Sequence, residues 1–154
     1  MKGIVIVLTL AALFVGVTVC LADSPQMGTW KLNEAKSKFG PGASKNTTVV
    51  YEASGDNIKV TVDGVDGSGA ATHNEWTGKF NGRFYPVTGD PTSDTRSYRK
   101  INNHTLALTA RKGRKITLTG RIVVSADGRT RTVTTNGTNS AGKRVSSRAV
   151  YDKQ

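Results

Sequence analysis

The chain has 154 residues, of which 22 are Lys or Arg and 11 are Asp or Glu, and its formal net charge is +11. Its single cysteine, Cys20, excludes a disulfide scaffold, a zinc finger and, once the N-terminal segment is removed, a thiol catalyst. The basic segments lack the interleaved aromatic side chains that stack nucleobases, so nucleic acid is not an expected partner.

Residues 1–22 have the three-part layout of a cleaved secretory signal. Lys2 precedes an uncharged apolar run of 16 residues, 4–19, which is shorter than the roughly 20 residues that cross a bilayer as a helix. We expect cleavage near Ala22 and a periplasmic or secreted protein with no transmembrane segment in its mature form. A membrane anchor and lipidation at Cys20 are the alternatives.

Residues 23–154 are expected to form one all-β domain, because short alternating runs are separated by Gly, Asn and Asp. The predicted strands are 29–32, 47–53, 57–63, 71–80, 83–88, 94–101, 105–110, 114–124, 129–135 and 143–151. Pairs such as Gly55-Asp56 suit hairpins between consecutive strands, and Asn33 is expected to cap a short helical turn within 33–39. A meander leaves two exposed edges unless it closes. The predicted fold is therefore a single up-and-down antiparallel β-barrel of about 8–10 strands.

Period-two alternation predicts which side chains point into the barrel. The predicted inward set is Trp30, Leu32, Val49, Tyr51, Ile58, Val60, Val62, Trp76, Phe80, Leu106, Leu108, Ile116, Leu118, Ile122, Val124, Val145, Ala149 and Tyr151. Arg131 shares the parity of Val133, so a regular strand would bury its guanidinium. That charge would need an internal carboxylate, an anionic ligand head group or the barrel mouth. The alternative is a bulge at 127–129 that turns Arg131 outward.

The stretch GTWKLN at 28–33, the meander of about ten strands and the final SSRAVYDKQ resemble the calycin superfamily, which includes lipocalins and fatty-acid-binding proteins. More closely, GTWKLNEAKSKFGPG, YEASGDNIKVTVDGVD, YPVTGDP, SADGRTRTVTTNGT and AVYDKQ resemble a group of small exported bacterial proteins of unknown function. The calycin resemblance implies an internal site for a small apolar molecule. The carboxylate clamp of fatty-acid-binding proteins is not transferred, because Arg148 and Tyr151 are three residues apart rather than two. Lipocalins pack a late cationic residue over the first-strand Trp, which implies that Arg148 covers Trp30 from outside.

Charge is distributed unevenly along the expected mature chain. Residues 23–95 contain seven Lys and Arg against nine Asp and Glu, whereas residues 96–154 contain fourteen against two. This asymmetry indicates either an anionic partner, such as the cell-envelope surface or a small anion, or simply a solvated basic protein. The tip 111–115, with the sequence RKGRK, is predicted to project its charge into solvent.

His73 and Glu75 lie two residues apart on one predicted strand, and hence on one face, which is half of a metal or acid–base site. The sequence offers no third ligand, no nucleophile–base spacing and no glycine-rich phosphate loop. We therefore expect no enzyme activity, no metal and no cofactor, and we expect His73 to face solvent.

The expected function is to bind or carry a small lipophilic molecule, with an anionic head group as one option. The predicted ligand-binding residues are Trp30, Tyr51, Trp76, Phe80, Leu108, Arg131 and Tyr151. One alternative is a basic, envelope-associated protein whose barrel is solidly packed, so that these aromatic residues are core. Another is a minor enzyme activity at the barrel mouth.

Overall fold

The computed structural model describes residues 24–139 and 141–154. The predicted signal sequence, its cleavage near Ala22 and the alternative of lipidation at Cys20 fall on residues 1–23 and lie outside this range. Within the range, no helix has the length and hydropathy that a membrane crossing requires.

The described residues form eleven strands and one short helix, numbered in chain order. They are β1 (Gly28–Leu32), the 3₁₀ helix η2 (Glu34–Lys36), β2 (Lys38–Phe39), β3 (Lys45–Ser54), β4 (Asn57–Val65), β5 (Ala71–Gly78), β6 (Tyr85–Thr88), β7 (Thr95–Asn102), β8 (Thr105–Lys112), β9 (Lys115–Val124), β10 (Thr130–Thr138) and β11 (Arg144–Lys153). All ten predicted strands are confirmed, and β2 is additional. The predicted helical turn is confirmed in η2, where the Asn33 side chain accepts a hydrogen bond from the Lys36 amide.

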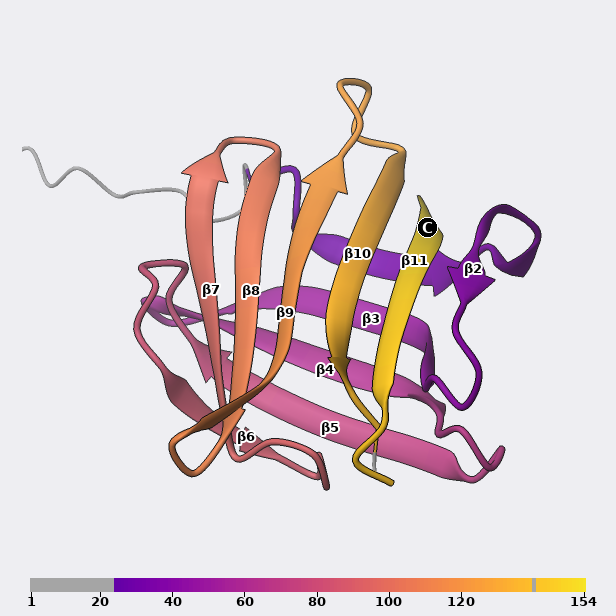
Figure 1. Cartoon of the computed structure of the whole chain (residues 1–154). Helices are drawn as coiled ribbons and strands as arrows, with labels where there is room; N and C mark the ends of the chain where they lie inside the picture. The colour runs from indigo at the N-terminus through magenta and orange to yellow at the C-terminus, as the bar shows by residue number, and fades with distance from the viewer. Residues whose placement is uncertain (1–23, 140) are drawn as a thin grey trace, which may run out of the picture.

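The sheet closes on itself as an up-and-down antiparallel barrel (Figure 1). Strands β3 to β11 pair in chain order, β1 pairs with β3, and β1 also pairs with β11. Glycines with positive φ sit in the tight hairpins, as at Gly55 (φ 58°) and Gly128 (φ 72°), where other residues would be strained. Closure leaves no open sheet edge in the main barrel, as the sequence predicts.

The barrel is flattened into two walls whose strands cross steeply. In Figure 1, β7 to β11 form the wall nearest the viewer, and β1, β3, β4 and β5 run across behind them. We call the first the β7–β11 wall. The sequence half with fourteen cations and two acids therefore becomes one side of the molecule.

The seam between the first and last strands is shared by β1 and β2, which pair with successive parts of the same edge of β11. η2 lies between them, so the edge of β11 loses its regular partner there. Ser37 replaces it: its hydroxyl accepts a hydrogen bond from the Val150 amide at 2.8 Å and donates one to the Asn33 carbonyl at 2.7 Å. The seam thus remains hydrogen-bonded where strand pairing stops.

The end of the barrel near the β9–β10 hairpin is closed by residues 24–27. Gln26 is buried, and its amide donates to the His104 carbonyl at 3.1 Å. The indole of Trp30 donates to the Gln26 carbonyl at 2.9 Å. This segment and Trp30 therefore form the floor of the barrel.

Above that floor, one aromatic cluster fills the side of the barrel near β5 and β7. Trp76 packs against Tyr98, Tyr85 and Phe80, with ring centroids 4.7–6.4 Å apart. Tyr51 joins the cluster through Phe80 and Tyr98. The Trp76 indole donates to the Arg96 carbonyl at 2.9 Å, which satisfies its only polar group.

The predicted inward face is correct at most positions and wrong at Ile116, whose exposed fraction is 52%. β8 and β9 pair regularly up to Ala110 and Leu118, but the next pair is Arg111 with Ile116. Thr117 is therefore an extra residue, and this β-bulge reverses the facing of everything beyond it. Ile116 consequently lies on the outer face with Arg111.

The structure also shows where the side chains of Arg131 and Arg148 lie. β10 pairs with β9 and β11 without interruption, opposite Val124 and Tyr151 at Arg131, so the outward-turning bulge is wrong and Arg131 points inward. The implied packing of Arg148 over Trp30 is also wrong. Arg148 is exposed and donates to the Lys36 carbonyl, whereas the ammonium of Lys153 lies 5.3 Å from the Trp30 ring.

Candidate functional site

The barrel encloses a cavity of about 220 Å³. Its base is formed by residues near the closed end, among them Tyr51, Arg131 and Tyr151, and apolar side chains such as Leu108 and Val133 line its middle. Its opening lies at the opposite end, among the loops that connect β2 to β3, β4 to β5, β6 to β7 and β10 to β11. The cavity is therefore a blind pocket with one polar mouth.

Arg131 is the charged group at the base of this cavity. Its exposed fraction is 2%, and its Nε and Nη1 atoms have no hydrogen-bond partner among the described residues. Within those residues, no carboxylate lies within 4.0 Å of it. Its side chain enters the cavity because β10 is regular on both sides.

Three aromatic rings hold the Arg131 guanidinium. Its central carbon lies 5.3 Å from the Trp30 ring, 4.9 Å from Tyr51 and 5.0 Å from Tyr151. The stabilisation from each such cation–π contact is modest. Together the three contacts fix the position of the guanidinium without neutralising its charge. They do not replace the hydrogen bonds that its free N–H groups require.

The two tyrosines beside Arg131 do not supply a negative charge. Burial raises the pKa of Tyr151 to about 12, although the nearby Arg131 acts in the opposite direction. Burial, together with Tyr98, holds the pKa of Tyr51 even further above its ordinary value. Both hydroxyls are therefore protonated at neutral pH, and the cation remains unbalanced.

A second charged group, the ion pair of Asp90 and Arg96, stands at the mouth. Arg96 Nη2 lies 3.1 Å from Asp90 Oδ2, and both side chains are largely buried. Burial alone would raise the pKa of Asp90. Hydrogen bonds from Ser93 and Thr92 and the charge of Arg96 outweigh burial and hold that pKa below its ordinary value. This pair is self-contained, in contrast to Arg131.

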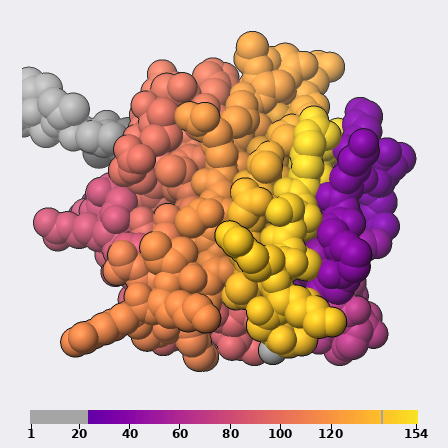
Figure 2. All heavy atoms as spheres, in the orientation of Figure 1, coloured from indigo at the N-terminus to yellow at the C-terminus, as the bar shows by residue number. Residues whose placement is uncertain are grey.

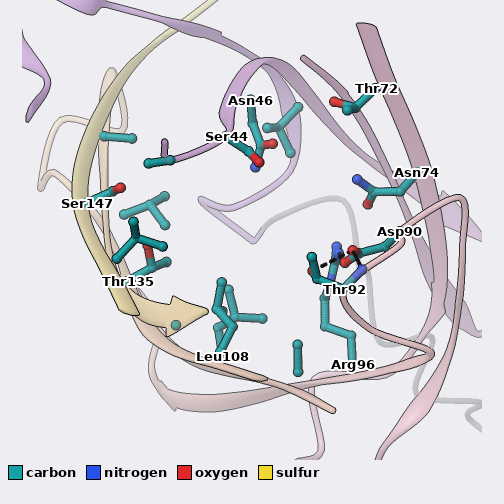
Figure 3. A pocket seen from close by; sticks show the side chains of 18 of the residues that line it. Ser44, Asn46, Thr72, Asn74, Asp90, Thr92, Arg96, Leu108, Thr135 and Ser147 are labelled. Carbon is teal, nitrogen blue, oxygen red and sulfur yellow. Dashed lines mark hydrogen bonds and ion pairs between the residues drawn. The ribbon is translucent and has the colours of Figure 1, made fainter. Parts of the chain in front are cut away.

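The rest of the mouth is polar on both sides (Figure 3). Asn74, Asp90 and Arg96 lie on one side of the opening, with Thr135 and Ser147 across from them. The side-chain oxygen of Asn74 is buried without a hydrogen-bond partner among the described residues. The cavity therefore offers a cation at its base, apolar walls and unsatisfied polar groups above.

The structure divides the predicted ligand-binding residues into two sets. Tyr51, Leu108, Arg131 and Tyr151 line the cavity together. Trp30, Trp76 and Phe80 are not among the lining residues and pack in the core behind them.

Three polar residues at the mouth, Asn74, Asp90 and Arg96, were not among the predicted ligand-binding residues. Asn74 shares the parity of Trp76, which is predicted to point inward, and Arg96 shares the parity of Tyr98, so alternation offered a signal for both of them. Asp90 sits in a loop, where period-two alternation carries no information.

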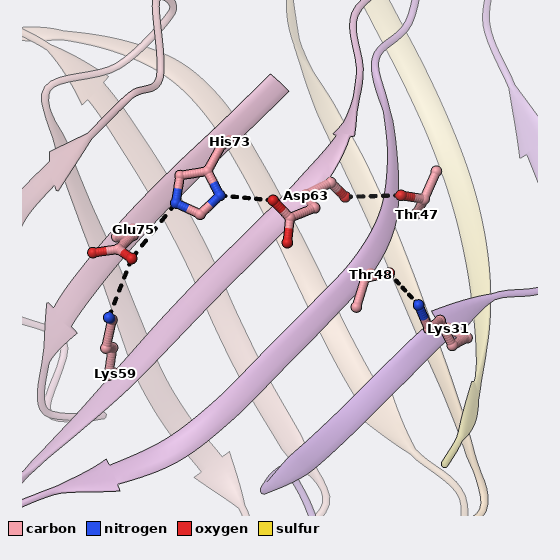
Figure 4. Close-up of polar contacts among 7 residues, drawn as sticks. All are labelled: Lys31, Thr47, Thr48, Lys59, Asp63, His73 and Glu75. Atoms are coloured by element: carbon pink, nitrogen blue, oxygen red, sulfur yellow. Dashed lines mark hydrogen bonds and ion pairs between the residues drawn. The ribbon is translucent and has the colours of Figure 1, made fainter. Parts of the chain in front are cut away.

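His73 and Glu75 lie outside the barrel, in a chain of surface charges (Figure 4). His73 Nδ1 is 2.6 Å from Asp63 and Nε2 is 3.5 Å from Glu75, which also pairs with Lys59 at 3.1 Å. Within residues 24–139 and 141–154, no group of three or more His, Cys, Asp or Glu side chains is placed to hold a metal ion.

The contacts of His73 with Asp63 and Glu75 predict how its imidazole titrates. The hydrogen bond that the His73 ring donates to the Asp63 carboxylate raises the pKa of His73 above its ordinary value, and Glu75 adds to the effect. An NMR titration of the imidazole should therefore show a midpoint above about 6.5. Asp63→Asn should lower that midpoint because the protonated form loses its main partner. A midpoint unchanged by Asp63→Asn would contradict the pairing.

Known proteins offer a distant structural likeness to this chain and no match by sequence. No protein-family model matches the chain, and no curated protein matches it by sequence. A solved structure of EF1p2_mFAP2b bound to DFHBI is similar with a TM-score of 0.47 at 9% identity, covering 84% of this chain and 94% of that chain. A likeness this distant says nothing about what this chain binds. The closed barrel itself is established by the strand pairing.

Proposed function

We propose that this protein is an exported, non-enzymatic binding protein that holds a small organic anion in its barrel, with the anionic head group on Arg131. The observation that carries the proposal is the guanidinium of Arg131 at the base of the cavity, on a residue that is only 2% exposed, with Nε and Nη1 donors that lack a partner among the described residues. An unpaired buried charge is strongly unfavourable. Binding of an anionic group beside the Arg131 guanidinium is therefore favoured. The cavity beside it provides the space.

A carboxylate is the head group best matched to this site. The planar guanidinium fork donates two parallel hydrogen bonds to a carboxylate, and a desolvated setting strengthens them. The rings of Trp30, Tyr51 and Tyr151 hold the fork from its sides, which preorganises it for a ligand arriving from the cavity.

The size of the cavity narrows the class of ligand further. A volume of about 220 Å³ is below the roughly 300–1,000 Å³ that encloses drug-sized molecules. Apolar walls such as Leu108 suit a short hydrocarbon or a single ring. The polar mouth around Asn74 suits a hydroxyl or amide at the far end. We therefore propose short amphipathic acids rather than long-chain lipids. The cavity also favours a ligand carrier over the alternative of a solidly packed barrel.

The test is calorimetric titration of residues 23–154 with 3-phenylpropionate, octanoate and palmitate, and with 3-phenylpropionamide as the neutral analogue. The barrel closes entirely within these residues, which justifies their use. We expect 3-phenylpropionate and octanoate to bind, palmitate to bind more weakly and the amide not to bind measurably. The Nε–H proton resonance of Arg131 should shift on binding, which reports the contact directly.

Arg131→Leu should abolish this binding while keeping or raising the melting temperature, because it removes an unpaired buried charge. Arg129→Leu is the matched control: it removes an exposed arginine two residues away and should leave binding unchanged. Equal affinity for 3-phenylpropionate and its amide, or unchanged binding by Arg131→Leu, would show that Arg131 does not hold an anion.

A further inference from the structure

The outer face of the β7–β11 wall carries three arginines in register. Arg99 on β7 pairs with Ala107, Ala107 pairs with Arg121 on β9, and Thr134 pairs with both Arg121 and Arg148 on β11. Residues directly opposite one another in an antiparallel sheet share a face, so the three guanidiniums project from one side. Alternate strands place them about 10 Å apart. We call Arg99, Arg121 and Arg148 the arginine row.

The surroundings of the arginine row are cationic as well. Eleven of the fourteen Lys and Arg side chains in residues 96–154 are exposed, and the segment contains only two acids, Asp127 and Asp152. Asp127 lies at the tip of the β9–β10 hairpin, where it binds Ser125 and the Arg129 amide. Figure 2 shows this wall as one continuous face of β7 to β11. Its positive charge therefore adds up across the face.

The opposite wall differs, because the half of the sequence that forms it carries nine acids beside its seven cations. Lys59 contacts Glu75, and Asp63 and Glu75 flank His73 on the outer face of β4 and β5. Positive charge there is compensated locally, so the molecule has a marked electrical polarity. An anionic surface would orient the β7–β11 wall toward itself.

The same wall exposes apolar side chains. Among the described residues, three large hydrophobic side chains are exposed to solvent: Ile101 on β7, and Ile116 and Val123 on β9. Ile116 faces outward because of the bulge at Thr117, and Val123 shares the outward parity of Arg121. Cations surrounding solvent-exposed aliphatic side chains are the combination that peripheral membrane surfaces present.

We propose that the outer face of the β7–β11 wall docks on the surface of a bilayer that contains anionic lipids. The arginine row binds lipid phosphates, and Ile116 and Val123 contact the boundary of the acyl chains. A bilayer fits better than a free polyanion because a polyanion uses the charges but gives the aliphatic residues nothing to contact. Nucleic acid fits poorly, since the wall offers no exposed aromatic residue among those described.

Sedimentation of residues 23–154 with vesicles tests the proposal. Vesicles of phosphatidylcholine with about one third phosphatidylglycerol should capture the protein at low salt. Capture should mostly disappear near half-molar salt, where the screening length falls to about 4–5 Å. Pure phosphatidylcholine vesicles should not capture it.

Three variants that each remove three positive charges locate the contact. Replacing the arginine row by Gln should weaken vesicle binding by of the order of 100-fold, since each cation near an anionic bilayer contributes about 1 kcal/mol. Replacing Lys112, Arg114 and Lys115 at the β8–β9 tip should weaken it less. Replacing Lys31, Lys59 and Lys79 outside the wall should have the smallest effect. Equal effects of the three variants, or the largest effect at the tip, would overturn the assignment to the wall.

A fourth variant separates a bilayer from a polyanion. Ile116→Ser with Val123→Ser changes no charge and should weaken vesicle binding several-fold, while leaving binding to soluble polyphosphate unchanged. Tighter binding to polyphosphate than to vesicles, with no effect of this double variant, would show that the wall recognises a polyanion and not a membrane. Neither result depends on the cavity, since Arg131→Leu should bind vesicles as the parent does.

Discussion

Replacing Trp30 by Ala should lower the free energy of unfolding by about 3–5 kcal/mol, as large-to-small changes in a packed core do. Trp30 has no exposed surface, and it closes the floor of the barrel. Its removal leaves a cavity between residues 24–27 and Arg131, takes away one of the rings that hold the guanidinium, and leaves the Gln26 carbonyl without its indole donor. Urea denaturation of residues 23–154 measures the loss.

Lys59→Ala is the control for that experiment. Lys59 lies on the outer face of β4, and its contact with Glu75 is a surface ion pair, so the loss should stay below about 1 kcal/mol. If Trp30→Ala and Lys59→Ala destabilised the protein equally, the inward and outward faces derived from strand register would be wrong.

Replacing Asp90 by Ala should lower the free energy of unfolding by about 3 kcal/mol, which is typical of breaking a largely buried ion pair. The variant leaves Arg96 at the cavity mouth without the carboxylate that it pairs with. It also removes the acceptor of the hydrogen bonds from the Ser93 and Thr92 hydroxyls. Glu52→Ala, on an exposed carboxylate of β3, should change stability by no more than about 0.5 kcal/mol. Similar losses for Asp90→Ala and Glu52→Ala would contradict the pairing.

The contribution of Asp90 to stability should decrease as the pH falls. The folded-state pKa of Asp90 lies below its ordinary value, so the folded state favours the ionised carboxylate. The stability difference between the parent and Asp90→Asn should be fully present above the unfolded-state pKa of about 3.9 and disappear as pH falls through the lower folded-state pKa. A difference that persisted at lower pH would have to come from shape or hydrogen bonding rather than charge.

Strand content and barrel closure follow from local signals in the sequence. Alternation between Ile58, Val60 and Val62 marks an inward face, and a residue pair such as Gly55-Asp56 marks a hairpin. When such units follow one another, pairing in chain order is the simplest arrangement, and exposed edges disfavour an open sheet. These features depend on neighbours a few residues apart, which is why the sequence is sufficient for them.

The bulge and the site depend on register between strands. Whether Ile116 faces in or out is set by one additional residue, Thr117, and nothing in the alternation of β9 marks it. Arg131 illustrates the same dependence, because both of its directions were compatible with its own strand. The contact between its guanidinium and Tyr51 joins residues 80 positions apart, and it becomes visible only once the barrel is assembled.

The unequal pairing of the strands gives the barrel unequal resistance to local opening. β6 is joined to β5 through two residue pairs and to β7 through two more, whereas β10 and β11 share nine. Breaking a short ladder exposes few hydrogen bonds, so fluctuations that detach β6 are energetically accessible long before the sheet unfolds as a whole. The loop that carries Asp90 continues directly from β6 to the cavity mouth. Opening of this one strand would therefore change the width of the cavity mouth while the longer ladders of the barrel stay paired.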